Sequence, residues 1–290
     1  MRENDLLAQN IERFCSRFDE PDHLVAGLRT FLHDFLSRQA VVVPLPAYGN
    51  IIHPVPEQYR YAEVQARIEA DADIGNEFLA GLQEYWNSEN LQQIPVDKVN
   101  ETDPYWQNGF LARSDASALY SIVARYQPRR IIEMGVGNST KFARKAINDH
   151  GLSTVITSID PTPRANISGI TDLHLECTIH DVDLELIGQL QANDILFLDG
   201  SHVSFCGTDV PFYFLNILPL VQPGVLVHIH DILLPDEYHA EFRRRHYNEQ
   251  YMLAAMLLFS SEWEILLPVA YLAREGRLKQ GGSSFWMRRK

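Results

Sequence analysis

The 290-residue sequence has few cysteines and lacks a long uninterrupted apolar run. Its three cysteines, Cys15, Cys177 and Cys206, are far apart and odd in number, which argues against a disulfide framework and against a clustered zinc site. No apolar run reaches the ~18 residues that a membrane-spanning helix needs. The sequence also does not open on the basic-then-apolar pattern of a signal peptide. We therefore expect a soluble, cytoplasmic protein that has no membrane partner.

Basic residues are scarce as well. Lys and Arg number 25 against 38 Asp and Glu, so the formal net charge is -13 and the isoelectric point is about 5.3. Nucleic acid binding needs a basic patch that neutralises phosphates, and the run Arg243-Arg244-Arg245 is too short to supply one. We expect no nucleic acid partner. The hydrophobic content of 46% is ample for a core, and the length indicates one large domain with an appendage, or two domains.

The first hundred or so residues have a helical pattern. Apolar residues recur at helical spacing in 6–18 and 24–36, whereas the proline-rich segment 41–56 favours an extended crossing. A charge-rich helical pattern returns over 57–86, and the polar region 87–108 is expected to be a loop. We treat 1–108 as an N-terminal helical region that could be a substrate lid or the interface of a homo-oligomer.

From Leu111 onward, strand patterns alternate with helix patterns, which is typical of a doubly wound, mostly parallel α/β sheet. This second region, 109–290, is expected to be the catalytic core. Its last two strands lack a strong helical pattern between them and are expected to pair antiparallel. The expected strands are 131–133, 155–159, 173–179, 195–198, 225–229, 263–267 and 283–287, and the expected helices are 115–126, 141–147, 184–190, 211–218 and 248–259.

The sequence RIIEMGVGNST, residues 130–140, carries the clearest motif. A short apolar strand ends at Glu133, a turn with Gly135 and Gly137 follows, and a helix starts at once. This is how α/β proteins hold nucleotide-like ligands, because glycine allows the tight turn and the close approach of a ligand to the main chain. A dinucleotide fingerprint would require a third glycine, and the sequence has Thr140 at that position.

The pattern Glu133-x-Gly135-x-Gly137-x-Ser139-Thr140 resembles motif I of the class I S-adenosylmethionine (SAM) methyltransferases. The resemblance implies a Rossmann-like, seven-stranded sheet whose last strand is reversed. It also implies that these five residues bind SAM, with the acidic side chain near its methionine part. A cationic ligand without phosphates suits a carboxylate at this strand end.

Acidic residues also end the next two strands. Asp160 lies 27 residues after Glu133, and a carboxylate there can accept hydrogen bonds from both ribose hydroxyls. It could instead be a turn or cap residue before Pro161. At the third strand, the resemblance places the adenine contact near Asp181. Asp181 could equally be an N-cap of the following helix, as could Asp183.

The fourth and fifth strands end at Asp199 and at His230-Asp231. Neighbouring parallel strands deliver their ends to one edge of the sheet, so we expect these side chains to converge there. Two carboxylates and an imidazole can bind a divalent cation, but His230 and Asp231 could also be a hydrogen-bonded pair with a structural role. His202 follows Asp199 by three residues and could act as a general base, because an imidazole titrates near neutrality. His228 lies deeper in the strand and is expected to be a core residue.

LDGSH at 198–202, together with PGVLVHIHDI at 223–232, resembles a narrower branch that contains macrocin-type sugar O-methyltransferases and cephalosporin hydroxylase-like proteins. That resemblance implies a metal ligand at Asp199, a general base at His202 and a second acidic ligand at Asp231. His230 stands where the branch has Glu. An imidazole suits a transition metal better than magnesium.

The sequence therefore predicts a SAM-dependent methyltransferase that acts on a hydroxyl oxygen of a small molecule, either with or without the assistance of a metal. One alternative is an NAD-dependent oxidoreductase on the same topology, in which Asp160 would hold the ribose; Thr140 counts against it. Another alternative is a relative that binds SAM or a metal without transferring a methyl group.

Overall fold

The computed structural model describes residue 56 and residues 58–163 and 166–290. The expected helices 6–18 and 24–36 and nearly all of the proline-rich segment lie outside these residues. Contacts between residues divide the chain into the units 1–54 and 55–290. The description below concerns the second unit, which already includes most of the helical pattern 57–86. The expected change from an N-terminal helical region to a core at 108 stays a prediction.

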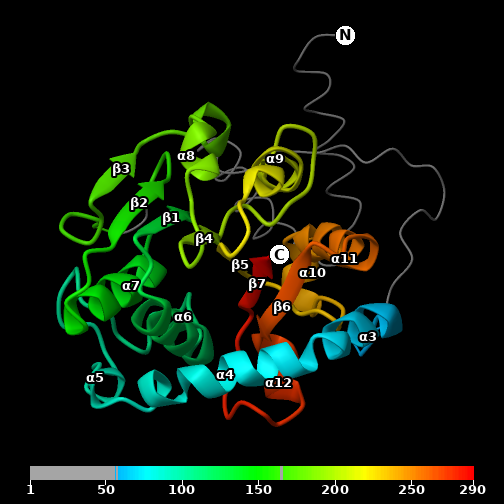
Figure 1. Ribbon diagram of the computed structural model, residues 1–290, viewed down its shortest axis with the longest axis horizontal. Helices are drawn as coiled ribbons and strands as arrows, with labels where there is room; N and C mark the ends of the chain where they lie inside the picture. Colours follow the sequence, from blue (N-terminus) through cyan, green and yellow to red (C-terminus); the bar gives the residue numbers. More distant parts are fainter. Residues whose placement is uncertain (1–55, 57, 164–165) are drawn as a thin grey trace, which may run out of the picture. The chain divides into compact units, whose positions relative to one another are not determined.

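The second unit is built on a seven-stranded sheet with the order β3-β2-β1-β4-β5-β7-β6 (Figure 1). The first five strands in chain order are parallel, and β7 runs antiparallel to both of its neighbours, β5 and β6. The doubly wound sheet with a reversed last strand is therefore confirmed. The strands are β1 Arg130–Met134, β2 Val155–Ile159, β3 Leu173–Leu175, β4 Ile195–Leu198, β5 Leu226–Ile229, β6 Trp263–Pro268 and β7 Phe285–Arg289.

Helices cover both faces of this sheet. Successive side chains along a strand point to opposite faces, so each strand contributes apolar side chains to the core on both sides. Ile131 of β1 belongs to the apolar cluster that contains α4, α6 and α7, whereas the adjacent Ile132 belongs to the cluster that contains α3, α8, α9 and α11. The helices are α3 Ala62–Ala70, α4 Ala72–Trp86, α5 Glu89–Gln92, α6 Arg113–Tyr126, α7 Asn138–Asp149, α8 Glu185–Gly188, α9 Asp209–Phe212, α10 Ala240–Arg244, α11 Glu249–Phe259 and α12 Val269–Arg274.

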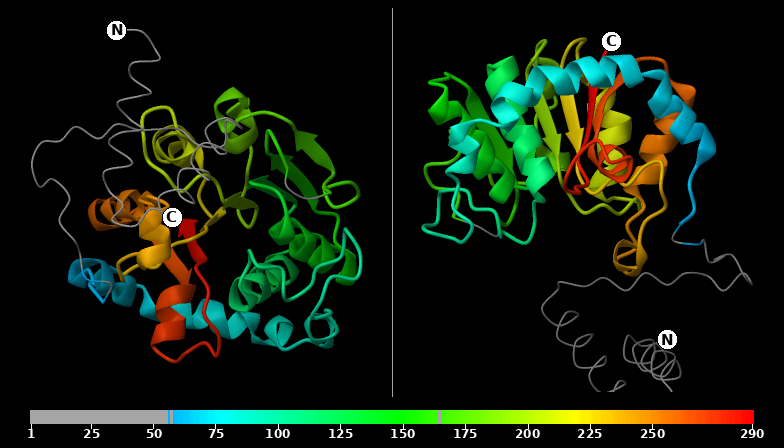
Figure 2. Two further views of the ribbon diagram at one scale, coloured as in Figure 1. Left: turned by 180° about the vertical axis from the view of Figure 1, so that it is seen from behind. Right: turned by 90° about the horizontal axis from the view of Figure 1, so that it is seen from below.

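The helical pattern 57–86 forms two consecutive helices, α3 and α4, separated at Asp71. The Asp71 carboxylate accepts a hydrogen bond from the Ile265 backbone N–H at 2.8 Å and pairs with Arg67 at 2.8 Å. The break in the helix is thus tied to β6. Figure 2 shows α3 and α4 spanning the unit, with α3 on the α11 side and α4 against α6. These helices belong to the same compact unit as the sheet.

Three local predictions need correction. The expected strand 173–179 ends at Leu175, and Ile179–Asp181 forms a 3-10 turn instead. The segment between β6 and β7, where no strong helix was expected, contains the short helix α12. The predicted loop 87–108 contains the short helix α5, which Ser88 caps by accepting from the Leu91 N–H at 3.4 Å. Short elements of this kind depend on tertiary contacts more than on periodicity.

None of the helices in the described residues combines the length and the apolar character required to cross a bilayer.

Candidate active site

The glycine turn lies at the carboxyl end of β1, between β1 and α7. Gly135 has φ of +75°, and a Cβ atom at this position would come closer than 3.0 Å to the carbonyl oxygen of Asp199. Both observations require glycine, the first through backbone strain and the second through overlap with the neighbouring strand end. Gly137 then precedes α7 and donates its N–H to Thr140 Oγ1 at 3.0 Å. The strand, turn and helix arrangement expected from the motif is present.

Glu133 supports this turn from inside the protein. Its side chain accepts hydrogen bonds from the hydroxyls of Ser139 and Thr140, the latter at 2.5 Å, and the residue is only 3% exposed. Burial raises the pKa of Glu133 to about 8, although both hydroxyls oppose the shift. Three of the predicted cofactor residues thus hold one another and shape the turn. Their contacts with SAM stay predictions.

Asp160 lies at the end of β2, beside the glycine turn. Its Oδ2 accepts from the Val136 N–H at 3.2 Å, and its Oδ1 accepts from the Thr162 N–H at 2.8 Å. These two hydrogen bonds give Asp160 a structural role in the turn. The side chain is also partly exposed, so it remains accessible to ribose hydroxyls. Asp181 is exposed in the 3-10 turn after β3 and accepts from Thr178 Oγ1 at 2.7 Å. The adenine contact at Asp181 stays a prediction.

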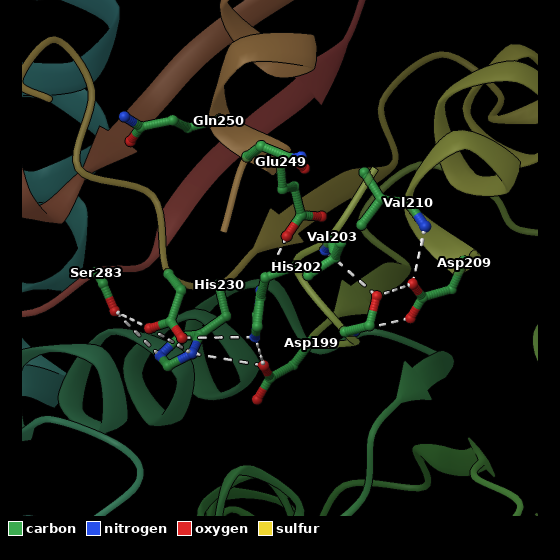
Figure 3. A network of polar contacts seen from close by, with 12 residues as sticks. Asp199, His202, Val203, Asp209, Val210, His230, Glu249, Gln250 and Ser283 are labelled. Atoms are coloured by element: carbon green, nitrogen blue, oxygen red, sulfur yellow. Dashed lines mark hydrogen bonds and ion pairs between the residues drawn. The ribbon is translucent and has the colours of Figure 1, made fainter. Parts of the chain in front are cut away.

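Asp199, His202 and His230 converge at the ends of β4 and β5, as expected (Figure 3). Asp231 lies within 4 Å of both imidazoles and completes the group. Asp199 Oδ1 lies 3.3 Å from His202 Nε2 and 3.6 Å from His230 Nδ1. Asp231 Oδ2 lies 3.5 Å from His202 Nε2, and Asp231 Oδ1 lies 3.4 Å from His230 Nδ1. One nitrogen of each imidazole therefore faces the space that the two carboxylates share. We call these four residues the strand-end cluster.

The other nitrogen of each imidazole faces a buried carboxylate that the sequence analysis missed. His202 Nδ1 lies 2.9 Å from Glu249 Oε2, and His230 Nε2 lies 3.6 Å from Asp115 Oδ2. Glu249 and Asp115 are each 1% exposed. Both occupy the first turn of a helix, where an acidic residue is favoured anyway by the helix dipole, so nothing in the spacing distinguished them.

The carboxylates determine the charge of the strand-end cluster. Burial alone would lower the pKa of His202, but its hydrogen bonds with Asp199 and Glu249 raise that pKa well above its usual range. The same balance raises the pKa of His230, through the charge of Asp199 and the contact with Asp115. The pKa of Asp199 is lowered although partial desolvation opposes the shift, first by the charge of His230 and then by the contact with His202. The protonated form of both imidazoles is therefore favoured in this arrangement, and the role of His202 as a general base stays a prediction.

Two residues of the strand-end cluster have unusual backbone conformations. His202 has φ of +61° and Asp231 has φ of +53°, in the left-handed region that side chains other than glycine rarely occupy. Such conformations persist where surrounding contacts impose them, and they concentrate at functional sites. By contrast, His228 is fully buried and stacks on Phe197 with ring centroids 3.7 Å apart. It is the core histidine that was expected.

Metal binding was expected at Asp199, His230 and Asp231. In residues 56, 58–163 and 166–290, no group of three or more His, Cys, Asp or Glu side chains is already arranged to hold a metal ion. The side chains of the strand-end cluster pair with one another instead.

Comparison with known proteins adds independent information. Residues 132–232 match the family model described as a methyltransferase domain. No match was found among curated proteins.

Several solved structures resemble the chain at low identity. The SAH-bound methyltransferase PaMTH1 from Podospora anserina is 14% identical, over 77% of this chain and 96% of that one, with a TM-score of 0.43. The O-methyltransferase TomG from Streptomyces achromogenes, which is involved in tomaymycin synthesis and has SAM bound, is 16% identical over 78% and 98% of the two chains, with a TM-score of 0.42. CmcI with Mg and SAM is 18% identical over 71% and 86%, with a TM-score of 0.40.

The matched segment contains both the glycine turn and the whole strand-end cluster. Residues 132–232 therefore match the methyltransferase domain family, in agreement with the resemblance of their motifs to the class I SAM-dependent methyltransferases.

Proposed function

We propose that the protein transfers the methyl group of SAM to a hydroxyl oxygen of a small molecule. The observation that carries this proposal is the direct approach of the glycine turn to the strand-end cluster. Gly135 is so close to the backbone of Asp199 that even a methyl side chain would overlap it. A cofactor held over this turn would lie next to a group of carboxylates and imidazoles that can bind and deprotonate a hydroxyl.

Each candidate residue has a defined role in this proposal. Asp160 would accept hydrogen bonds from the ribose, and the turn at Gly135 and Gly137 would admit the cofactor to the main chain. The methyl group moves from sulfur to the acceptor oxygen, so the carbon–sulfur bond breaks as the carbon–oxygen bond forms, and the hydroxyl proton must leave. Alignment of two bound reactants supplies most of the rate enhancement in such a reaction.

His202 Nε2 is the atom we propose as the proton acceptor, because Nδ1 is held by Glu249. In the structure the carboxylate partners of this imidazole raise its pKa and favour its protonated form. It becomes a base only in the state in which Nε2 has released its proton. Asp199 and Asp231 then remain beside Nε2 and stabilise the proton that it receives.

The proposal also includes assistance by a metal ion. Charge-assisted N–H···O contacts normally measure about 2.7–2.9 Å, whereas the contacts inside the strand-end cluster measure 3.3–3.6 Å. Ligand atoms that bind a zinc-sized ion at about 2.0–2.1 Å are separated from one another by distances similar to these contacts. Asp199, Asp231 and His230 would hold the ion, and the imidazole donor favours a transition metal over magnesium. A bound cation would stabilise a deprotonated oxygen of the acceptor.

Two measurements test the proposal. Isothermal titration calorimetry should show binding of SAM by the wild-type protein, and fluorescence titration should show no comparable binding of NADH. A mass-spectrometric screen of hydroxylated small molecules with SAM should then reveal a product heavier by one methyl group. Failure to bind SAM at high concentration would rule the proposal out, and NADH binding would favour the oxidoreductase alternative.

A further inference from the structure

We infer that Glu249 is a positioning residue for His202: it holds Nδ1 of the imidazole so that Nε2 points at the reacting hydroxyl. This inference rests on the proposed function, in which His202 Nε2 takes the acceptor proton.

The contact between Glu249 and His202 is the shortest that the imidazole makes. Glu249 Oε2 lies 2.9 Å from Nδ1, whereas the nearest oxygens to Nε2, from Asp199 and Asp231, lie 3.3 and 3.5 Å away. An ionised carboxylate only accepts hydrogen bonds, so the proton on Nδ1 is fixed there. The nitrogen that gains and loses a proton is then Nε2. Figure 3 shows His202 held between Glu249 on one side and Asp199 on the other.

The first turn of α11 holds the His202 loop at the backbone as well. The Asn248 N–H donates to the His202 carbonyl oxygen at 3.0 Å, and Asn248 Oδ1 accepts from the Ser204 N–H at 2.5 Å. The ring of Tyr247 packs on the imidazole with centroids 4.5 Å apart. These contacts explain how His202 is maintained at a positive φ. The Asn248 side chain binds this loop and makes no capping hydrogen bond to α11.

A purely structural role explains Glu249 poorly. The side chain is almost completely buried, and its Oε1 has no hydrogen-bond partner among the described residues. Removing a carboxylate and an imidazole from water is energetically unfavourable, and apolar residues of similar volume often stabilise a protein as well or better. Burial raises the pKa of Glu249 against the opposing influence of His202, which is the sign of that cost. Fixing the orientation of a reacting imidazole is a function that an apolar residue could not perform.

The variant Glu249→Gln tests this inference, with Glu237→Gln as its matched control. Glu237 is also buried, and it accepts hydrogen bonds from the hydroxyls of Tyr61 at 2.6 Å and Tyr251 at 2.5 Å. Both substitutions remove one buried carboxylate from the same region, but only the first removes the partner of His202. A carboxamide can present either its oxygen or its NH₂ group to Nδ1, so it no longer fixes the proton there.

The first readout needs neither cofactor nor acceptor. In ¹⁵N-histidine-labelled wild-type protein, the Nδ1–H of His202 should give a downfield, exchange-protected proton signal. The signal should be retained in Glu237→Gln and lost or exchange-broadened in Glu249→Gln. Its absence from the wild-type protein, or its persistence in Glu249→Gln, would overturn the inference. This experiment remains decisive if SAM binding fails, so the two proposals can fail separately.

The second readout uses the acceptor identified in the screen described above. Glu249→Gln should lower kcat at least tenfold, on the order expected for impaired general-base catalysis. The KM for SAM and the affinity for SAM measured by calorimetry should stay within about threefold, because α11 is not part of the glycine turn. Glu237→Gln should retain the wild-type kcat. Equal turnover of the two variants would overturn the inference.

Discussion

Gly135 and Asp199 meet where the cofactor turn adjoins the strand-end cluster. The Cα of Gly135 faces the Asp199 carbonyl oxygen so closely that a Cβ atom would overlap it. The contact ties the proposed SAM site to the proposed acceptor site through backbone alone, which keeps their separation constant. Two reactants held by such a rigid connection lose little further freedom on reaching the transition state.

The first prediction concerns Gly135 and uses Gly151 as its control. Both glycines have positive φ, +75° and +59°, but a Cβ atom at Gly151 would meet nothing within 4 Å. Gly151→Ala should cost about 1–2 kcal/mol of unfolding free energy for the left-handed conformation. Gly135→Ala should cost clearly more, because the added methyl overlaps the Asp199 carbonyl, and it should abolish SAM binding. Urea unfolding and calorimetry measure both effects; equal losses of stability would contradict the close contact.

The second prediction concerns the pH dependence of stability through Glu133. Its pKa is about 8 in the folded protein against a reference of 4.5. Because the folded pKa is raised, the stability contribution is complete below pH 4.5 and is lost as the pH rises towards 8. Glu133→Gln cannot ionise, so its stability relative to wild type should increase steadily between pH 5 and pH 8. Thermal or urea unfolding at several pH values measures the difference, and a pH-independent difference would refute the assignment.

A related effect is expected for the cofactor. If the cationic part of SAM stabilises ionised Glu133, binding should release a proton below pH 8 and SAM affinity should rise with pH in that range. Calorimetry in two buffers of different ionisation enthalpy would detect the released proton. Glu133→Gln should bind SAM without this release.

The third prediction separates the two halves of the site. Asp160→Ala removes a carboxylate that can make charge-assisted hydrogen bonds worth about 1.5–3 kcal/mol each, so SAM affinity should fall at least tenfold. Its metal content should not change. Asp199→Ala keeps the backbone carbonyl beside Gly135 and should keep SAM affinity, but it should lose a bound transition metal.

Elemental analysis after incubation with Zn²⁺, Mn²⁺ or Mg²⁺, followed by desalting, provides the metal readout for both variants. The wild-type protein should retain a transition metal in preference to magnesium. If it retains none, the metal part of the proposal is wrong, whereas methyl transfer itself is unaffected.

The fourth prediction concerns the loop that carries His202. A Cβ atom at Gly200 would overlap the Tyr213 hydroxyl and Asp209 Oδ2. The same Asp209 carboxylate accepts from the Tyr213 hydroxyl at 2.8 Å and from the Ser201 N–H at 2.8 Å, so it holds the loop to the helix that follows. Gly200→Ala should therefore destabilise the protein and displace His202.

Gly188→Ala serves as the control, because a Cβ atom there would meet nothing within 4 Å. Gly200→Ala should melt several degrees lower than Gly188→Ala, as expected for overpacking by 1–3 kcal/mol. Similar melting temperatures would show that the loop accommodates the methyl group without cost.

Much of the fold was accessible from the sequence, because parallel strands that are buried on both faces form short apolar runs with distinctive ends. Strands β2 and β4 match their expected limits, and the antiparallel pairing of β6 with β7 is confirmed. Elements that were missed or misjudged, among them α5, α10, α12 and the truncated β3, are short. Each depends on packing that the local pattern does not encode.

The sequence by itself determined that Asp160, Asp199 and His230-Asp231 end the second, fourth and fifth strands, and the topology of a doubly wound sheet then gathers them at one edge. Only the tertiary structure showed that Glu249 and Asp115 lie against the two histidines and favour their protonated forms. The physical reason is that α11 and α6 dock on the sheet through apolar faces distant in sequence from the site. That docking decides which carboxylate, at the start of each helix, comes to lie beside an imidazole.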